Sequence, residues 1–164
     1  MRTVLRLTPP HGSRYGSRVA EVRQSYSTTV AGTIERCFAV LNDFEAYPQW
    51  AGAVKRAEVL GRLPDGRAEL VHYQLDAGPI KDEYTLRYDW SAVPAVLRWE
   101  LVEGQMLRTL VGSYALAEGQ GGHTDVTYHL ALDVKIPLLG MIKRKAEKVI
   151  IDTALKELKK RVEG

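Results

Sequence analysis

The middle of the chain alternates between stretches rich in β-forming residues and short turns, and this pattern constrains the fold more than any other feature. Six stretches are predicted as strands: 54–60, 68–76, 81–90, 95–102, 106–117 and 124–134. The run Leu63-Pro64-Asp65-Gly66 between the first two is typical of a hairpin turn, because proline fixes φ and glycine accepts a positive φ. Parallel strands would need long crossovers, so these short links predict an antiparallel meander.

Within the predicted strands, apolar and aromatic residues alternate with polar ones. Trp99 and Leu101, for example, alternate with Arg98 and Glu100. The same period of two recurs in three other stretches: 81–90, 106–117 and 124–134. One face of the sheet is therefore apolar and the other solvated, and the apolar face requires a cover.

The residues after Pro137 supply that cover, because they form a long amphipathic helix. Apolar residues recur there at helical spacing: Leu138, Ile142, Ala146, Val149, Ile150, Ala154, Leu158 and Val162. Pro137 suits the first helical turn. At about 1.5 Å per residue, such a helix of about 25 residues crosses the whole sheet.

The residues before the meander complete the predicted fold. Residues 25–30 read as a strand, and 33–42 and 44–47 as helices, with Asp43 able to cap the second helix and Pro48 limiting it. The element order is β-α-α-β6-α. We therefore predict an α+β fold in which a curved antiparallel sheet of about seven strands wraps around a long C-terminal helix.

Residues 1–23 differ in character from the rest of the chain. They hold Pro9-Pro10, several Gly and Ser, and five arginines against one acid, with no helical or strand period. We interpret them as a flexible basic arm and residues 24–164 as one ligand-binding domain. Basic residues also gather in 137–164, which favours either a membrane-surface contact or a solvated helix face; a nucleic-acid partner is not expected.

The sequence further predicts a soluble cytoplasmic protein, as a monomer or homodimer. Cys37 is the only cysteine, so no disulfide forms within the chain, and its place in a helical run indicates a buried apolar role. Arg2 and Arg6 interrupt the N-terminal apolar stretch that a signal peptide would need. No stretch approaches the length and apolarity of a transmembrane helix.

The composition of the apolar face predicts a cavity. Eight tyrosines against two phenylalanines are unusual for a solid core, because each buried hydroxyl needs a partner. A helix about 10 Å wide also leaves part of a broad curved sheet uncovered. The candidate ligand-binding residues are Trp50, Tyr73, Tyr84, Leu86, Tyr88, Trp99, Leu110, Tyr114, Tyr128, Met141, Ile142 and Lys145. Arg108 or Lys145 could meet an acidic headgroup at one end of the cavity.

Motifs of catalysis and cofactor binding are missing from the sequence. The four histidines lack metal-ligand spacing, and no phosphate loop or nucleophile elbow occurs, so no cofactor and no metal are expected. The best acid–base candidates are His72, Asp76, Asp82 and Glu83. Alternation with Tyr73 turns His72 toward solvent, and Asp82-Glu83 is expected on a solvated rim of the cavity.

Four runs accompany the terminal helix: Asp43-Phe44-Glu45-Ala46-Tyr47-Pro48-Gln49-Trp50, Asp82-Glu83-Tyr84, Gly112-Ser113-Tyr114 and Thr124-Asp125-Val126-Thr127-Tyr128. Together they resemble the polyketide cyclase/dehydrase group of the START-like (SRPBCC) superfamily, which includes lipid-transfer and coenzyme Q-binding proteins. The resemblance covers residues 25–163 and implies a helix-grip fold with a ligand cavity.

Three functional hypotheses follow. The first is a binder or carrier of a small hydrophobic molecule such as a lipid, quinone or polyketide. The second, implied by the resemblance, is a polyketide cyclase/aromatase or dehydratase that uses the same cavity. The third is binding of a macromolecule or membrane surface through the basic arm and helix.

Overall fold

The computed structural model describes residues 2–3, 22–78, 80–136 and 140–164, and its main element is one antiparallel sheet. The strands are β1 (Arg2–Thr3), β2 (Val22–Val30), β3 (Val54–Arg62), β4 (Ala68–Ala77), β5 (Ile80–Asp89), β6 (Val96–Gly104), β7 (Leu107–Glu118) and β8 (Thr124–Val134). Their order across the sheet is β1-β2-β8-β7-β6-β5-β4-β3. The predicted meander, β3 to β8, is therefore confirmed, and β2 joins it beside β8.

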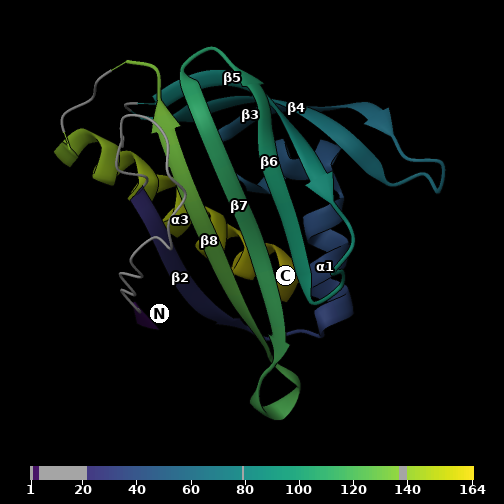
Figure 1. The fold of residues 1–164 in the computed structure, drawn as a ribbon. Helices are drawn as coiled ribbons and strands as arrows, with labels where there is room; N and C mark the ends of the chain where they lie inside the picture. The colour runs from purple at the N-terminus through teal and green to yellow at the C-terminus, as the bar shows by residue number, and fades with distance from the viewer. Residues whose placement is uncertain (1, 4–21, 79, 137–139) are drawn as a thin grey trace, which may run out of the picture.

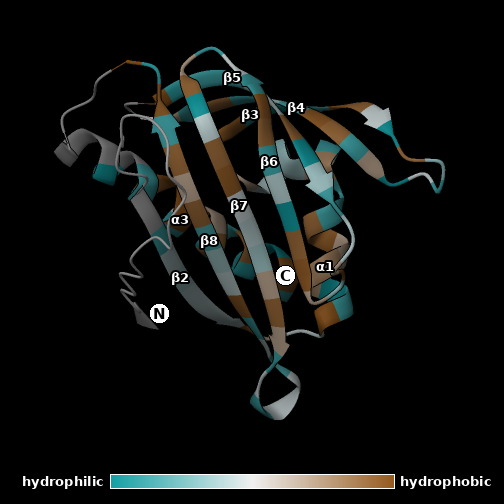
Figure 2. Cartoon of the chain, in the orientation of Figure 1, coloured by the Kyte–Doolittle hydropathy of each residue, from teal (hydrophilic) through white to brown (hydrophobic). Residues whose placement is uncertain are grey.

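The sheet curves around one long helix, α3 (Gly140–Glu163), which crosses its concave face (Figure 1). This confirms the predicted α+β helix-grip architecture. Bands of hydrophobic and hydrophilic residues alternate along the strands (Figure 2), as a sheet with one covered face requires. The hairpin turn between β3 and β4 also forms as predicted, since Gly66 has a φ of +89° and its N–H donates to the carbonyl of Leu63 at 2.9 Å.

Three short helical segments lie between β2 and β3. Helix α1 (Ile34–Asn42) begins at Thr33, whose hydroxyl accepts a hydrogen bond from Arg36 N at 3.2 Å, and buries Cys37. A 3-10 turn, η1 (Phe44–Ala46), leads into α2 (Tyr47–Trp50). Two details of the prediction were wrong: Asp43 makes no side-chain cap, and Pro48 lies in the first turn of α2, where its missing N–H costs nothing, rather than limiting the helix.

Helix α3 buries two neighbouring faces rather than one narrow stripe. Among its described side chains, the fully buried apolar residues are Ile151, Leu155, Leu158 and Val162, and the helix packs mainly against β2 and α1. Partly buried Ile150 and Ala154 face the sheet's hollow instead. The predicted stripe missed Ile151 and Leu155, because the helix packs against the sheet and against α1 together and so needs a wider apolar surface than one contact would.

The N-terminal segment is described only in part. Strand β2 begins at Val22, two residues before the predicted domain boundary at residue 24, and β1 pairs with Tyr26 and Ser27 of β2. Residues 4–21 lie outside the described part, so the flexible-arm interpretation stays a prediction. Among the described residues, no helix combines the length and apolarity that crossing a bilayer demands.

Candidate ligand cavity

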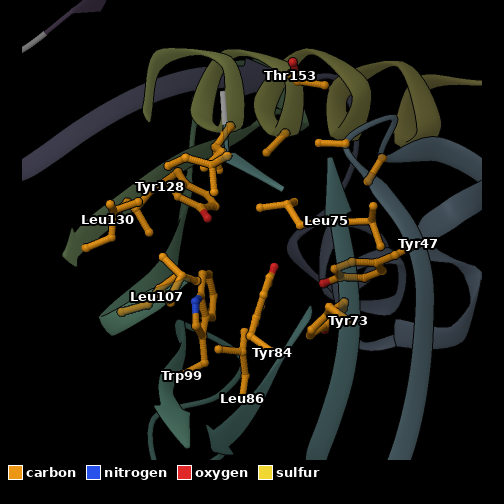
Figure 3. A pocket seen from close by; sticks show the side chains of 18 of the residues that line it. Tyr47, Tyr73, Leu75, Tyr84, Leu86, Trp99, Leu107, Tyr128, Leu130 and Thr153 are labelled. Carbon is orange, nitrogen blue, oxygen red and sulfur yellow. The ribbon is translucent and has the colours of Figure 1, made fainter. Parts of the chain in front are cut away.

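A cavity lies between the concave face of the sheet and α3 (Figure 3). Strands β3, β4, β5, β6, β7 and β8, helix α2 and one side of α3 all contribute to its wall. Nine of the twelve candidate residues line it: Trp50, Tyr73, Tyr84, Leu86, Tyr88, Trp99, Leu110, Tyr114 and Tyr128. For the eight that lie on strands, the shared inward direction follows from strand alternation, since residues two apart point to the same face. Their contact with a ligand stays a prediction.

The free space in the cavity is narrow. The closed cavity has a volume of about 90 Å³. An engineered apolar cavity of roughly 150 Å³ binds benzene. A ligand of the size of benzene or larger therefore needs side chains of the wall to move.

The exposure of the lining residues locates the mouth of the cavity. All described lining residues are buried except five, which are partly exposed: Ala53, Val54, Ile150, Thr153 and Ala154. The first two begin β3 and the other three lie on the middle of α3. The mouth therefore lies between the start of β3 and α3.

A hydrogen bond joins the two sides beside this mouth. The amide of Gly52, directly before Ala53, donates to Glu157 Oε2 at 2.6 Å, and Glu157 lies one helical turn after Thr153. On the β3 side, the carbonyl of Ala53 also accepts from Asp76 N at 2.8 Å. The mouth is thus bordered by a carboxylate–amide contact that ties α3 to the start of β3.

The aromatic residues of the wall form a continuous network. Trp99 is its centre, with ring centroids 5.9 Å from Tyr88, 5.3 Å from Tyr114 and 5.7 Å from Tyr128. Tyr73 and Tyr84 extend the network along β4 and β5, with centroids 5.6 Å apart. Tilted and edge contacts are arrangements that aromatic pairs prefer. The rings of the closed wall are therefore packed against one another.

The tyrosine hydroxyls divide into two groups. Three have partners: Tyr47 donates to the carbonyl of Leu41 at 2.5 Å, and the hydroxyls of Tyr73 and Tyr88 bond each other at 2.5 Å. Three others, on Tyr84, Tyr114 and Tyr128, have no hydrogen-bond partner among the described residues. Figure 3 shows the hydroxyls of Tyr84 and Tyr128 directed toward the open centre of the cavity.

Burial raises the pKa of every tyrosine in the wall. It is the largest cause for Tyr84, to which the neighbouring Tyr128 and Asp82 add. The same cause raises the pKa of the other five: Tyr47, Tyr73, Tyr88, Tyr114 and Tyr128. All six are therefore neutral near pH 7. They can donate hydrogen bonds but cannot act as phenolate bases.

Three candidate residues do not belong to the described wall. Lys145 is exposed and absent from the lining, because its angle on α3 points it away from the sheet. The side chains of Met141 and Ile142 lie outside the described part of the structure. Arg108, considered for an acidic headgroup, instead bonds Asp133 Oδ2 at 3.4 Å. No cation of the described residues lines the cavity.

The sequence interpretation also missed part of the wall. The missed residues include Tyr47, Leu75, Ile80, Leu107, Leu130, Leu132, Ile150 and Thr153. For Leu130 and Leu132 the signal was present, since they alternate in phase with Tyr128. Tyr47 gave no such signal, because its direction depends on the turn from η1 into α2.

The acid–base candidates lie outside the cavity lining and make contacts elsewhere in the structure. His72 is on the outer face, with Nδ1 3.1 Å from Thr85 Oγ1 and Nε2 3.7 Å from Glu83. Asp76 forms a surface ion pair with Lys81 at 3.7 Å. The outward placement of His72 confirms the alternation argument, and none of these residues lines the cavity.

Asp82 corrects the prediction of a solvated rim. It is 5% exposed and accepts three backbone hydrogen bonds from the β6–β7 turn: from Gln105 and Met106 at 3.0 Å and from Leu107 at 2.8 Å. A buried carboxylate surrounded by N–H donors is stable without a cation. Asp82 therefore fixes the turn that positions Leu107 in the wall.

The described residues contain no group of His, Cys, Asp or Glu able to hold a metal ion. Cys37 is fully buried in α1, and burial raises the pKa of its thiol. Among the described lining residues, the only titratable side chains are the neutral tyrosines. The cavity is thus aromatic and uncharged.

Known proteins of this architecture bear on the identity of the chain. No curated protein matches it significantly in sequence. Among solved structures, a START superfamily protein from Mycobacterium smegmatis is 23% identical, with a TM-score of 0.80 over 88% of this chain and 98% of that one. The Zhui aromatase/cyclase from Streptomyces sp. R1128 is 14% identical, with a TM-score of 0.74 over 88% and 94%.

A protein from Thermus thermophilus is 19% identical, with a TM-score of 0.73 over 86% of this chain and 97% of that one. At such identities these structures establish the shared fold. The family model described as polyketide cyclase/dehydrase and lipid transport matches residues 21–163, nearly the whole length of the sheet and helices. The chain therefore belongs to the polyketide cyclase/dehydrase and lipid transport family and has its START-type fold.

Proposed function

We propose that this protein binds and carries a small hydrophobic molecule, such as a lipid, quinone or polyketide, in the cavity between its sheet and α3. One observation carries the proposal: a continuous aromatic and aliphatic wall surrounds a cavity that has a mouth and no ionised group among its described lining residues. Apolar pockets with a few polar groups are the usual form of small-molecule sites. Family membership supports the same interpretation.

An enzymatic role, as a polyketide cyclase/aromatase or dehydratase, is the second candidate. The family description and the fold shared with an aromatase/cyclase favour it. Proton transfer near pH 7 needs a group whose pKa lies close to that pH. The described wall offers only tyrosines with raised pKa values, and His72 and Asp82 lie outside it. The absence of a base among these residues weighs toward binding without catalysis.

A macromolecular or membrane-surface role through the basic residues has less support. On α3, Lys159 Nζ is held by the carbonyl of Thr29 at 2.6 Å and by Glu163 at 2.9 Å, and Arg161 bonds Gln49 at 3.1 Å. These cations stabilise the attachment of the helix and are less available to an anionic surface. Binding to anionic vesicles that falls steeply with salt would favour this role.

Native mass spectrometry of the protein from its own host tests the main proposal. The matched variants are Ala154→Phe, which places a ring at the mouth, and Ala39→Phe, the same change at an exposed position of α1. We expect an apolar species to co-purify with the wild type and with Ala39→Phe, and to be lost from Ala154→Phe. Organic extraction then identifies its class.

Two results would contradict the proposal. A species retained by Ala154→Phe would place binding outside the cavity. A protein that purifies empty and shows no saturable binding of apolar probes would indicate a solid core. If the protein converts a probe into a chemically different product and releases it, the enzymatic role is established instead.

A further inference from the structure

Tyr84 and Tyr128 bring two hydroxyl groups to the centre of an otherwise apolar cavity (Figure 3). Each residue is 7% exposed, and neither hydroxyl has a hydrogen-bond partner among the described residues. Tyr114, 4% exposed, contributes a third such hydroxyl to the wall. These hydroxyl oxygens reach the open space of the cavity, where they are available to a molecule that enters it.

The other tyrosines of the wall show that the fold can satisfy such groups. Tyr73 and Tyr88 bond each other, and Tyr47 donates to the carbonyl of Leu41. Phenylalanine would fill the positions of Tyr84 and Tyr128 equally well if only packing mattered. Their hydroxyls are instead positioned as donors for a group that enters the cavity.

The wall also limits the charge of that group. No Lys, Arg or His of the described residues lines the cavity, and Lys145 is exposed outside it. A carboxylate or phosphate inside would lose its hydration with no cation of the described wall to replace it, and a buried unpaired charge is strongly unfavourable. An ammonium group would lack a carboxylate in the same way.

Taking the proposed binding function as its basis, we infer that the ligand is neutral and carries an oxygen acceptor, such as a ketone or quinone carbonyl, that accepts hydrogen bonds from Tyr84 and Tyr128. The rings of Trp99, Tyr114 and Tyr128, with centroids 4.8 to 5.7 Å apart, favour a planar body beside that oxygen. The described wall offers no cation to a free fatty acid or another anionic lipid.

Three probes of similar shape separate these properties. Acetophenone is neutral and carries a carbonyl, α-methylstyrene replaces that oxygen by a methylene group, and benzoate is an anion at pH 7. Their binding is measured by NMR titration of the isotope-labelled full chain, with shifts mapped to the wall. The proteins are the wild type, Tyr84→Phe, Tyr128→Phe, the double variant, and Tyr26→Phe as control. Tyr26 is outside the cavity and donates to Gln24 at 2.9 Å.

We expect each Phe substitution in the wall to weaken acetophenone binding about 3- to 10-fold, the usual range for one hydrogen bond. Binding of α-methylstyrene should be unchanged or tighter, and Tyr26→Phe should change neither. Benzoate should leave the resonances of the wall unshifted. Comparison of variants within one probe removes the difference in hydrophobicity between probes.

The inference is overturned if benzoate shifts the wall as acetophenone does, or if the Phe variants bind both neutral probes as the wild type does. If the Phe variants bind both neutral probes as the wild type does, the cavity still binds α-methylstyrene. The proposed carrier function then stands, without the hydrogen bond to an oxygen. If neither neutral probe reaches the wall in any variant, the carrier function and the inference both fail. A thermal melt of each variant confirms that it is folded.

Discussion

The indole ring of Trp99 packs directly over the α-carbon of Gly112, its cross-strand partner on β7. A Cβ at residue 112 would lie 2.4 Å from Nε1 and Cε2 of that ring, much closer than non-bonded atoms approach. Glycine at this position therefore lets the central aromatic ring of the cavity lie flush with the sheet.

We expect Gly112→Ala to displace the Trp99 ring into the cavity. Such overpacking costs about 1–3 kcal/mol of unfolding free energy and would also weaken ligand binding. Urea denaturation measures the first effect, and probe titration the second. Gly61→Ala is the matched control, since its Cβ would meet Leu70 at an ordinary 3.7 Å. Equal stability of the two variants would show that the ring moves aside freely.

Much of this wall could be predicted from the sequence, because alternation in a strand fixes which residues share a face. Tyr84, Leu86 and Tyr88 on β5 are one such set, and all line the cavity. Once six strands and a covering helix are recognised, their inward direction follows without further information.

The remaining features depend on contacts between elements distant in sequence. Lys145 was misplaced, because helical period alone does not fix which side of α3 meets the sheet. The role of Asp82 was missed, because the turn that it binds follows more than twenty residues later. The dipeptide Asp82-Glu83 reads as surface, and only the β5–β6 pairing shows that Asp82 lies beneath that turn.

The hydroxyl of Tyr47 stabilises the end of α1. It donates to the carbonyl of Leu41, in the last turn, where helical carbonyls lack partners within the helix. Tyr47→Phe leaves this buried carbonyl unpaired, and we expect a loss of about 1–3 kcal/mol in chemical denaturation. Tyr84→Phe removes a hydroxyl with no partner in the part of the chain that the structure describes, and it should be neutral or stabilising. The reverse order of stability would contradict the hydrogen-bond assignment.

Alkaline pH should destabilise the fold through the six wall tyrosines. Burial raises the pKa of each, Tyr84 among them, above the value of about 10 that tyrosine has in an unfolded chain. The folded state favours the neutral form of these tyrosines, whereas the unfolded chain ionises above pH about 10. The free energy of unfolding is therefore unaffected by them below pH about 10 and falls as the pH rises further. Tyrosinate absorbance should therefore increase together with loss of circular dichroism. Reversible ionisation of these residues within the folded protein would contradict the prediction.

Asp82 should be a principal determinant of the β6–β7 turn. Asp82→Asn keeps the shape but turns an amide N–H₂ toward backbone donors such as Leu107 N. Hydrogen bonds to a charged acceptor contribute about 1.5–3 kcal/mol, so we expect a loss of stability of that order. Faster hydrogen exchange at Met106 and Leu107 would locate the effect.

Glu83→Gln is the control for Asp82→Asn. Glu83 is exposed, and its ion pair with His72 is a surface contact at 3.7 Å on the outer face of the sheet. Glu83→Gln should change the free energy of unfolding by no more than about 0.5 kcal/mol. If Asp82→Asn behaves like this control, the turn is held by its own backbone hydrogen bonds, and the carboxylate has no structural role.

The contact between Glu157 and Gly52 should control how fast a ligand enters and leaves. It ties α3 to the start of β3 beside the mouth, and the closed cavity is too narrow for a large ligand. If the mouth must open first, Glu157→Ala raises the association and dissociation rates together, by about 10-fold for a contact of about 1.4 kcal/mol. Affinity changes little, since open and closed states are shifted for the free and bound protein alike.

Glu163→Ala provides the matched control for this mouth contact. Glu163 also pins α3 through a backbone amide, that of Ala31, at 2.8 Å, but at the end of the helix and outside the cavity lining. Both variants should lose some stability, whereas only Glu157→Ala should accelerate exchange in stopped-flow measurements with a fluorescent apolar probe. Equal exchange rates in the two variants would mean that the ligand enters elsewhere. Faster exchange in both variants would mean that weakening the attachment of α3 at either point opens the cavity. The contact between Glu157 and Gly52 would then have no special role at the mouth.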